Sequence, residues 1–139
     1  KKMGRVFFNT RKNVHSLTAA YTVLASDSGK DFILDAAAGV AITLPSAATM
    51  GNGWNCRFLV GTAFDTSNWQ ITATAAVMKG GINELEVDTS DDGPSTVGGT
   101  TVDFVHSLET VGDYVDLMCD GTTIFFRGQA KLDGGILLA

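Results

Sequence analysis

Short segments in which apolar and polar residues alternate run through the chain, each bounded by Gly, Asn or Asp. A period of two places successive side chains on opposite faces of a strand, so this pattern predicts half-buried β-strands and not helices. Nine segments show it, at residues 31–35, 40–44, 54–61, 69–74, 82–88, 101–106, 113–119, 122–127 and 130–137. No window supports an amphipathic helix of three turns, because the two Ala-rich stretches end at Gly or begin after Pro.

Strands of this length and spacing predict an all-β fold. Many short strands that recur about every ten residues are typical of an antiparallel β-sandwich, and we expect a jelly-roll-like form of it. Between residues 113–119 and 122–127, Asp120 and Gly121 predict a type I′ hairpin turn, since both central residues of that turn need a positive φ. The alternating apolar residues of the two strands would then share one buried face.

Length and composition agree with one folded domain. The chain has 139 residues, of which 45% are apolar and 18% charged, with 16 Gly and 2 Pro. These proportions exclude the highly charged disordered class and the collagen-like class. The longest segment without a charged side chain, residues 36–56, is interrupted by Gly39, Pro45 and Gly51, so it cannot form a membrane-spanning helix.

Charge divides the chain into two unequal parts. Residues 1–16 carry five basic side chains and no acid, whereas the remainder carries five basic and fifteen acidic ones. We therefore expect an extended basic N-terminal arm, residues 1–16, followed by an acidic β-sandwich domain, residues 17–139. The candidate binding residues of the arm are Lys1, Lys2, Arg5, Val6, Phe7, Phe8, Arg11 and Lys12.

Such an arm suits contact with nucleic acid or with an acidic protein surface. A solvated tail without a partner is the alternative, but the apolar residues Val6, Phe7 and Phe8 favour an arm that becomes ordered against something. The acidic domain itself lacks the clustered Lys and Arg that phosphate contacts need.

One loop has half of a calcium-binding motif. Residues 88–93 place oxygen-bearing side chains at the first, third and fifth positions and Gly at the sixth, but Gly99 stands where an EF-hand needs Glu. No helical pattern flanks the segment and Pro94 follows it. We interpret it as a polar loop between strands, with calcium binding as the alternative.

No set of residues forms a convincing catalytic motif. Asp27, Ser28 and Gly29 match the aspartic-protease signature, but their polar neighbours do not, so a turn is a sufficient explanation. His15 and His106 have neither a Ser in a strand-to-helix elbow nor a Cys nearby. We therefore predict no enzymatic activity, no metal site and no cofactor.

The two tryptophans and two cysteines are expected in the core. Trp54 and Trp69 each begin an apolar strand, which favours burial over a platform on which a sugar stacks. Cys56 and Cys119 lie far apart without a CxxC pattern, which indicates buried free thiols in a reducing cytoplasm. A disulfide would require their two strands to be adjacent.

Several segments together resemble a family of tailed-bacteriophage virion proteins. They are residues 17–20 (LTAA), 27–35 (DSGKDFILD), 37–45 (AAGVAITLP), 56–63 (CRFLVGTA), 112–117 (GDYVDL), 120–122 (DGT) and 128–130 (GQA). In this pattern they are similar to the small β-sandwich proteins that decorate or cement phage capsids. Phe64 and Phe125 depart from it, since the family usually has Pro and often has Trp at these places.

The resemblance implies a non-enzymatic structural protein on the capsid surface of the virion, made in the host cytoplasm. Its partner would be the major capsid protein, reached through the basic arm and its apolar anchors, with no role for nucleic acid or membrane. The high apolar fraction and the few charges predict self-association, and the resemblance favours a homotrimer first and a dimer second. Because related modules occur in phage tails and fibres, a glycan- or ligand-binding module of such a structure is the alternative.

Overall fold

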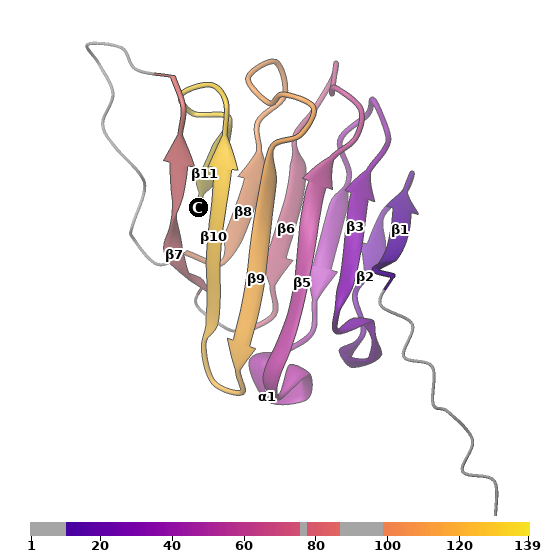
Figure 1. Cartoon of the computed structure of the whole chain (residues 1–139), viewed down its shortest axis with the longest axis vertical. Helices are drawn as coiled ribbons and strands as arrows, with labels where there is room; N and C mark the ends of the chain where they lie inside the picture. Colours follow the sequence, from indigo (N-terminus) through magenta and orange to yellow (C-terminus); the bar gives the residue numbers. More distant parts are fainter. Residues whose placement is uncertain (1–10, 76–77, 87–98) are drawn as a thin grey trace, which may run out of the picture.

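The computed structural model describes residues 11–75, 78–86 and 99–139. This part of the chain forms two β-sheets packed face to face (Figure 1). The six-stranded sheet, sheet A, has the order β1-β3-β5-β9-β10-β7, and the five-stranded sheet, sheet B, has the order β11-β8-β6-β4-β2. The strands are β1 Asn13–Leu17, β2 Tyr21–Thr22, β3 Lys30–Leu34, β4 Ala41–Leu44, β5 Asn52–Val60, β6 Trp69–Ala73, β7 Met78–Glu84, β8 Thr101–Phe104, β9 Tyr114–Asp120, β10 Ile124–Ala130 and β11 Ile136–Leu138. A 3₁₀ turn, η1 (Ala25–Asp27), and one helical turn, α1 (Ala47–Met50), complete the described elements.

The predicted all-β sandwich is confirmed, but the prediction that its strands are antiparallel is wrong for more than half of the pairs. Among the described strands, β1/β3, β3/β5, β2/β4, β4/β6 and β7/β10 pair in parallel. Only β5/β9, β9/β10, β6/β8 and β8/β11 are antiparallel. The reason is that each of the first six strands is followed by a strand in the other sheet. Among these six, when the chain comes back to a sheet, the new strand runs in the same direction as the previous strand of that sheet, so the two pair in parallel.

The strand alternation is explained by burial between the sheets. In β5, Trp54, Cys56, Phe58 and Val60 are buried, whereas the residues between them point to the outer face of sheet A. Phe58 stacks on Phe32 of β3 with ring centroids 5.0 Å apart. Each large apolar side chain buried in this way stabilises the fold by about 1.5–3 kcal/mol relative to exposure.

The predicted strands overlap observed ones, and two of them differ in extent. The segment 82–88 overlaps β7 only up to Glu84, and the segment 130–137 covers the end of β10, a turn and most of β11. Strands β1 and β2 were not predicted. From Asn13 onward the expected arm belongs to sheet A, because Asn13–Leu17 pairs with Lys30–Leu34. Residues 1–10 lie outside the described residues.

The β9–β10 hairpin turn lies one residue further along than predicted. Asp120 N–H donates to Thr123 O at 3.2 Å, which makes Gly121 and Thr122 the central residues. Gly121 has a φ of +91° and Thr122 is not among the positive-φ residues, so the turn is of the II′ kind and not I′. Asp120 Oδ1 accepts hydrogen bonds from the backbone N–H groups of Thr122 and Thr123, at 2.8 and 2.6 Å. Because Cys119 pairs with Ile124, the alternating apolar residues still share the buried face.

Within the described residues, no helix has the length and apolar character needed to cross a membrane.

Candidate functional site

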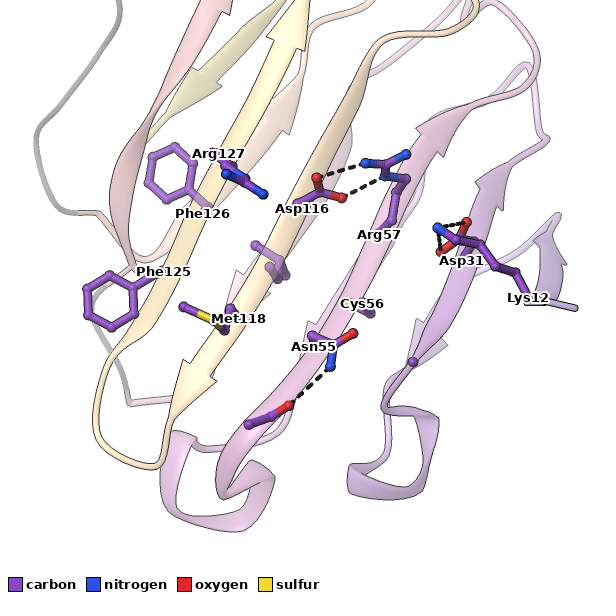
Figure 2. Close-up of a pocket in the computed structure, with 13 residues that line it drawn as sticks. Lys12, Asp31, Asn55, Cys56, Arg57, Asp116, Met118, Phe125, Phe126 and Arg127 are labelled. Carbon is purple, nitrogen blue, oxygen red and sulfur yellow. Dashed lines mark hydrogen bonds and ion pairs between the residues drawn. The ribbon is translucent and has the colours of Figure 1, made fainter. Parts of the chain in front are cut away.

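The outer face of sheet A carries a row of charged side chains that crosses four strands. The strand register places Asp31 of β3 beside Arg57 of β5, Arg57 beside Asp116 of β9, and Asp116 beside Arg127 of β10. Lys12, just before β1, joins the row because its Nζ lies 3.0 Å from Asp31 Oδ2. The signs alternate along the whole row, which we call the charge ladder (Figure 2).

The centre of the charge ladder is a bidentate ion pair. Arg57 Nε and Nη2 donate to the two carboxylate oxygens of Asp116 at 2.6 and 2.8 Å, and the Arg57 guanidinium lies 4.5 Å from the ring centroid of Tyr114. Hydrogen bonding to Asp116 raises the pKa of Arg57. Since both side chains are about one-third exposed, the pair contributes about 1 kcal/mol or less to stability. Its main effect is to fix both side chains in one orientation.

A hollow of about 660 Å³ lies along one side of the charge ladder, above Asn55, Met118 and Phe125. The side chains of Met118 and Phe125 are exposed apolar groups, 54% and 39% accessible, and neighbour each other across β9 and β10 (Figure 2). A smaller hollow of about 470 Å³ lies on the other side of the ladder, above amide and aromatic side chains. Three ladder residues line both hollows, namely Arg57, Asp116 and Arg127.

The second feature of sheet A is the edge formed by β1. Within the described chain β1 pairs only with β3, so one side of its backbone faces outward at the end of the sheet (Figure 1). Val14 on this strand is 55% exposed. Of the predicted arm residues, Arg11 and Lys12 are exposed at the start of this edge. Residues Lys1, Lys2, Arg5, Val6, Phe7 and Phe8 lie outside the described residues.

The acidic residues of segments 27–35 and 112–117 accept hydrogen bonds within the fold. Asp27 is buried, and its carboxylate accepts hydrogen bonds from Lys30 Nζ, Leu24 N–H and Tyr21 Oη–H. Asp113 is also buried and accepts from the backbone N–H groups of Thr110 and Lys131. The aspartic-protease-like motif is therefore a structural turn, as its neighbours in the sequence predicted.

Burial raises the pKa of Asp113, and this effect exceeds that of its two backbone hydrogen bonds. Glu109 lies nearby and its negative charge acts in the same direction. These two carboxylates differ from the ladder residues in that both are buried.

Of the remaining candidate residues, the tryptophans and cysteines are buried and the two histidines are exposed. Trp54 and Trp69 are buried, as predicted, so neither offers a surface for a sugar. Cys56 and Cys119 are buried free thiols, and burial raises the pKa of Cys56 well above its usual range. His106 Nδ1 lies 3.1 Å from Asn68 Oδ1.

Neither histidine belongs to a metal cluster within the described residues. His15 contacts the rings of Tyr21 and Phe32. Over the described ranges, no group of three His, Cys, Asp or Glu is placed to bind a metal ion. The calcium-like segment 88–93 lies outside them.

The charge ladder was not predicted from the sequence. Its members were recognisable only as single polar residues within apolar strands, and their mutual contact depends on pairing β5 with β9, 59 positions away. Only the proximity of Asp116 and Arg127 could have been predicted from the hairpin pattern, because these two residues face outward on consecutive strands.

Comparisons of the chain with family models, with curated proteins and with solved structures found no match.

Proposed function

We propose that this chain is a non-enzymatic decoration protein of a tailed phage, which binds the outer surface of the assembled capsid and stabilises it. The major capsid protein is the proposed partner, and the capsid surface of the virion is the proposed location. The observation that carries the proposal is that the basic N-terminal segment leads directly into β1, the exposed edge of sheet A. The segments that resemble phage decoration proteins support it, because their acidic residues Asp27, Asp113 and Asp120 accept hydrogen bonds within a small β-sandwich.

The edge strand gives the arm a physical means of attachment. An edge strand presents backbone N–H and C=O groups that are able to pair with an added strand, and its side chains supply the specificity. Val14 is exposed on β1, and residues 1–12 add five positive charges in front of it. We infer that the positive charges guide the arm to an acidic capsid surface, while Val6, Phe7 and Phe8 provide apolar anchors.

A protein that binds only the assembled shell stabilises that shell by mass action. Decoration therefore needs no bond-making step, and the chain needs only rigidity and a surface that matches the capsid. The two packed sheets and their aromatic core supply that rigidity. We also propose that the arrangement is jelly-roll-like in one respect: the chain passes repeatedly from one sheet to the other. The directions in which the strands pair differ from those of a jelly roll.

The alternative is a glycan- or ligand-binding module of a phage tail or fibre. Its ligand would have to bind a surface other than the Trp54 and Trp69 platform that the sequence allowed. Trp54 and Trp69 are both in the core. The 660 Å³ hollow beside the charge ladder supports this alternative, because the exposed Phe125 ring lies there next to charged side chains and the Asn55 amide.

Two truncations test the proposal. Removing residues 1–10 leaves β1 in place, so we expect a folded protein with an unchanged melting temperature that no longer binds expanded, preformed capsids in a co-sedimentation assay. Removing residues 1–16 also deletes most of β1, so we expect it to lower the melting temperature as well. Full capsid binding by the chain that lacks residues 1–10 would refute docking through the arm.

A full-length variant separates charge from chain length. Replacing Lys1, Lys2 and Arg5 together by Gln should weaken capsid binding and reduce its dependence on salt. The matched control replaces three basic residues outside the arm, Lys79, Lys131 and Arg127, and should leave capsid binding intact. If both triple variants lose binding equally, net charge and not the arm governs attachment.

A further inference from the structure

The charge ladder ends at Arg127, and no negative side chain stands at the paired position of the next strand. Along the row Lys12, Asp31, Arg57, Asp116 and Arg127 the charges alternate, and every carboxylate lies between two cations. Asp116 gives both of its oxygens to Arg57, and within the described residues Arg127 makes no ion pair. The strand register then places Gly81 of β7 beside Arg127. Gly has no side chain, so the next position of the row is open to a carboxylate from outside.

The groups around Arg127 are those that contact a sugar ring. Phe125 lies two residues earlier on the same face of β10, about 7 Å away by the strand rise, and is 39% exposed. A ring stacked on Phe125 therefore brings an attached carboxylate within reach of the Arg127 guanidinium. Asn55 lines the same hollow and donates its amide N–H to Gly53 O at 3.1 Å, which leaves its amide oxygen as an acceptor for a hydroxyl group. The volume of the hollow, about 660 Å³, is within the usual range for small-ligand sites.

The backbone around this hollow favours a sugar over an acidic peptide. Extended peptides usually bind sheets by adding a strand to an edge. Strands β3, β5, β9 and β10 are each paired on both sides, so no backbone edge is open beneath the hollow. Recognition there has to come from side chains alone, through the Phe125 ring face, the Arg127 cation and the Asn55 amide, and a carboxylate-bearing sugar presents the groups that match them.

We propose that the 660 Å³ hollow binds an acidic saccharide, with the sugar ring stacked on Phe125. The sugar carboxylate pairs with Arg127, which lines both hollows, on the side where Gly81 lines the smaller one. This binding activity does not depend on capsid attachment.

Nuclear magnetic resonance titration of the full-length protein with trigalacturonic acid tests the inference. We expect saturable shifts of the amide resonances of Gly81, Phe125 and Arg127, with weaker binding as salt is added. Arg127→Gln should weaken binding at least tenfold, because it removes a charge-assisted hydrogen bond. Gly81→Glu should weaken it to a similar degree, because the new carboxylate occupies the position of the ligand. Lys131→Gln makes the same charge change away from the hollow and should alter affinity less than twofold.

Three results would overturn the inference. The first is the absence of saturable shifts at 10 mM trisaccharide. The second is equal affinity for the neutral methyl ester of the trisaccharide, which would show that the carboxylate is not recognised. The third is tighter binding of a hexaglutamate peptide, which would make the surface a site for an acidic protein segment. If Gly81→Glu does not fold, Arg127→Gln and the methyl ester still decide the matter.

Discussion

Replacing Asp27 tests whether the segment at residues 27–35 determines the fold. The Asp27 side chain is 3% exposed, and its Oδ1 accepts from Lys30 Nζ at 2.6 Å. Its Oδ2 accepts from Leu24 N–H at 2.8 Å and from Tyr21 Oη–H at 3.0 Å. One carboxylate therefore connects the 3₁₀ turn η1, strand β2 and the start of β3.

The cost of removing this carboxylate follows from the number of groups that lose a partner. Asp27→Ala leaves two neutral donors without an acceptor, at about 1 kcal/mol each, and removes a carboxylate that faces an ammonium group. We expect a loss of about 3 kcal/mol in the free energy of unfolding. Asp27→Asn keeps the volume and one acceptor oxygen, so we expect about 2 kcal/mol.

The pH dependence of the loss has a definite sign. Burial raises the pKa of Asp27, but hydrogen bonds from Lys30, Leu24 and Tyr21 together outweigh it, so the pKa lies below its ordinary value of 3.8. A group whose pKa is lowered by folding stabilises the protein above its ordinary pKa, and that contribution is lost as the pH falls through the lowered value. The stability difference between the parent protein and Asp27→Asn should therefore be constant near neutral pH and shrink below pH 3.8.

Urea unfolding of the parent, Asp27→Asn, Lys30→Met and the double variant measures these effects. The double variant should lose less stability than the two single variants together, because each single change removes the same ion pair. Asp31→Asn is the control, since Asp31 pairs with a Lys12 side chain that is largely exposed, and should cost about 1 kcal/mol or less. The reasoning is refuted if Asp27→Asn unfolds within about 0.5 kcal/mol of the parent, or if its deficit persists unchanged at pH 3.

Three further outcomes are expected. Gly121→Val should cost about 1–3 kcal/mol in thermal unfolding, because Gly121 has a φ of +91°, whereas Asp92→Ala, in the segment 88–93, should cost under about 0.5 kcal/mol with or without a calcium chelator; a larger, chelator-sensitive effect of Asp92→Ala would identify a calcium loop. Asp103→Asn should raise stability at pH 7, because burial raises the pKa of Asp103 and its buried Oδ1 accepts no hydrogen bond, so the parent loses stability as the pH rises through that pKa; equal stability of the two at pH 7 would contradict this. Sedimentation of the free protein should show self-association, with a trimer first and a dimer second, and a monomer at micromolar concentration would remove self-association as a property of the free chain.

The sequence predicted the strands well because burial alone produces their alternation. A strand such as β5 shows its pattern of Trp54, Cys56, Phe58 and Val60 whichever neighbours it pairs with. For the same reason the pattern contains no information about the direction in which strands pair. The parallel pairing of β1, β3 and β5 could therefore not be predicted. Direction depends on how the chain passes between the two sheets, which is a property of the whole topology.

The elements that the sequence did not predict are those with few buried residues or too few residues to show an alternating pattern. Strand β1 is exposed at four of its five residues, so it has no apolar alternation and only Leu17 is buried. Strand β2 has two residues, too few for any period to show. The charge ladder was missed because its pairs join distant strands, and the ion pair between Arg57 and Asp116 exists only once β5 and β9 are adjacent.

The proposed capsid contact and the proposed sugar site use different parts of sheet A, and Lys12 shows why they are expected to act independently. Lys12 is the last basic residue of the arm and the first member of the charge ladder. Because β1 is paired with β3 over five residues directly after Lys12, an arm that docks at the edge does not need to move Asp31 or the residues beyond it.

Docking at the edge would therefore leave the outer face of sheet A open. The chain without residues 1–10 should lose capsid binding and keep its affinity for trigalacturonic acid, whereas Arg127→Gln should do the reverse. Loss of both activities in both variants would mean that one continuous surface serves both, and that the charge ladder transmits changes from β1 to β10.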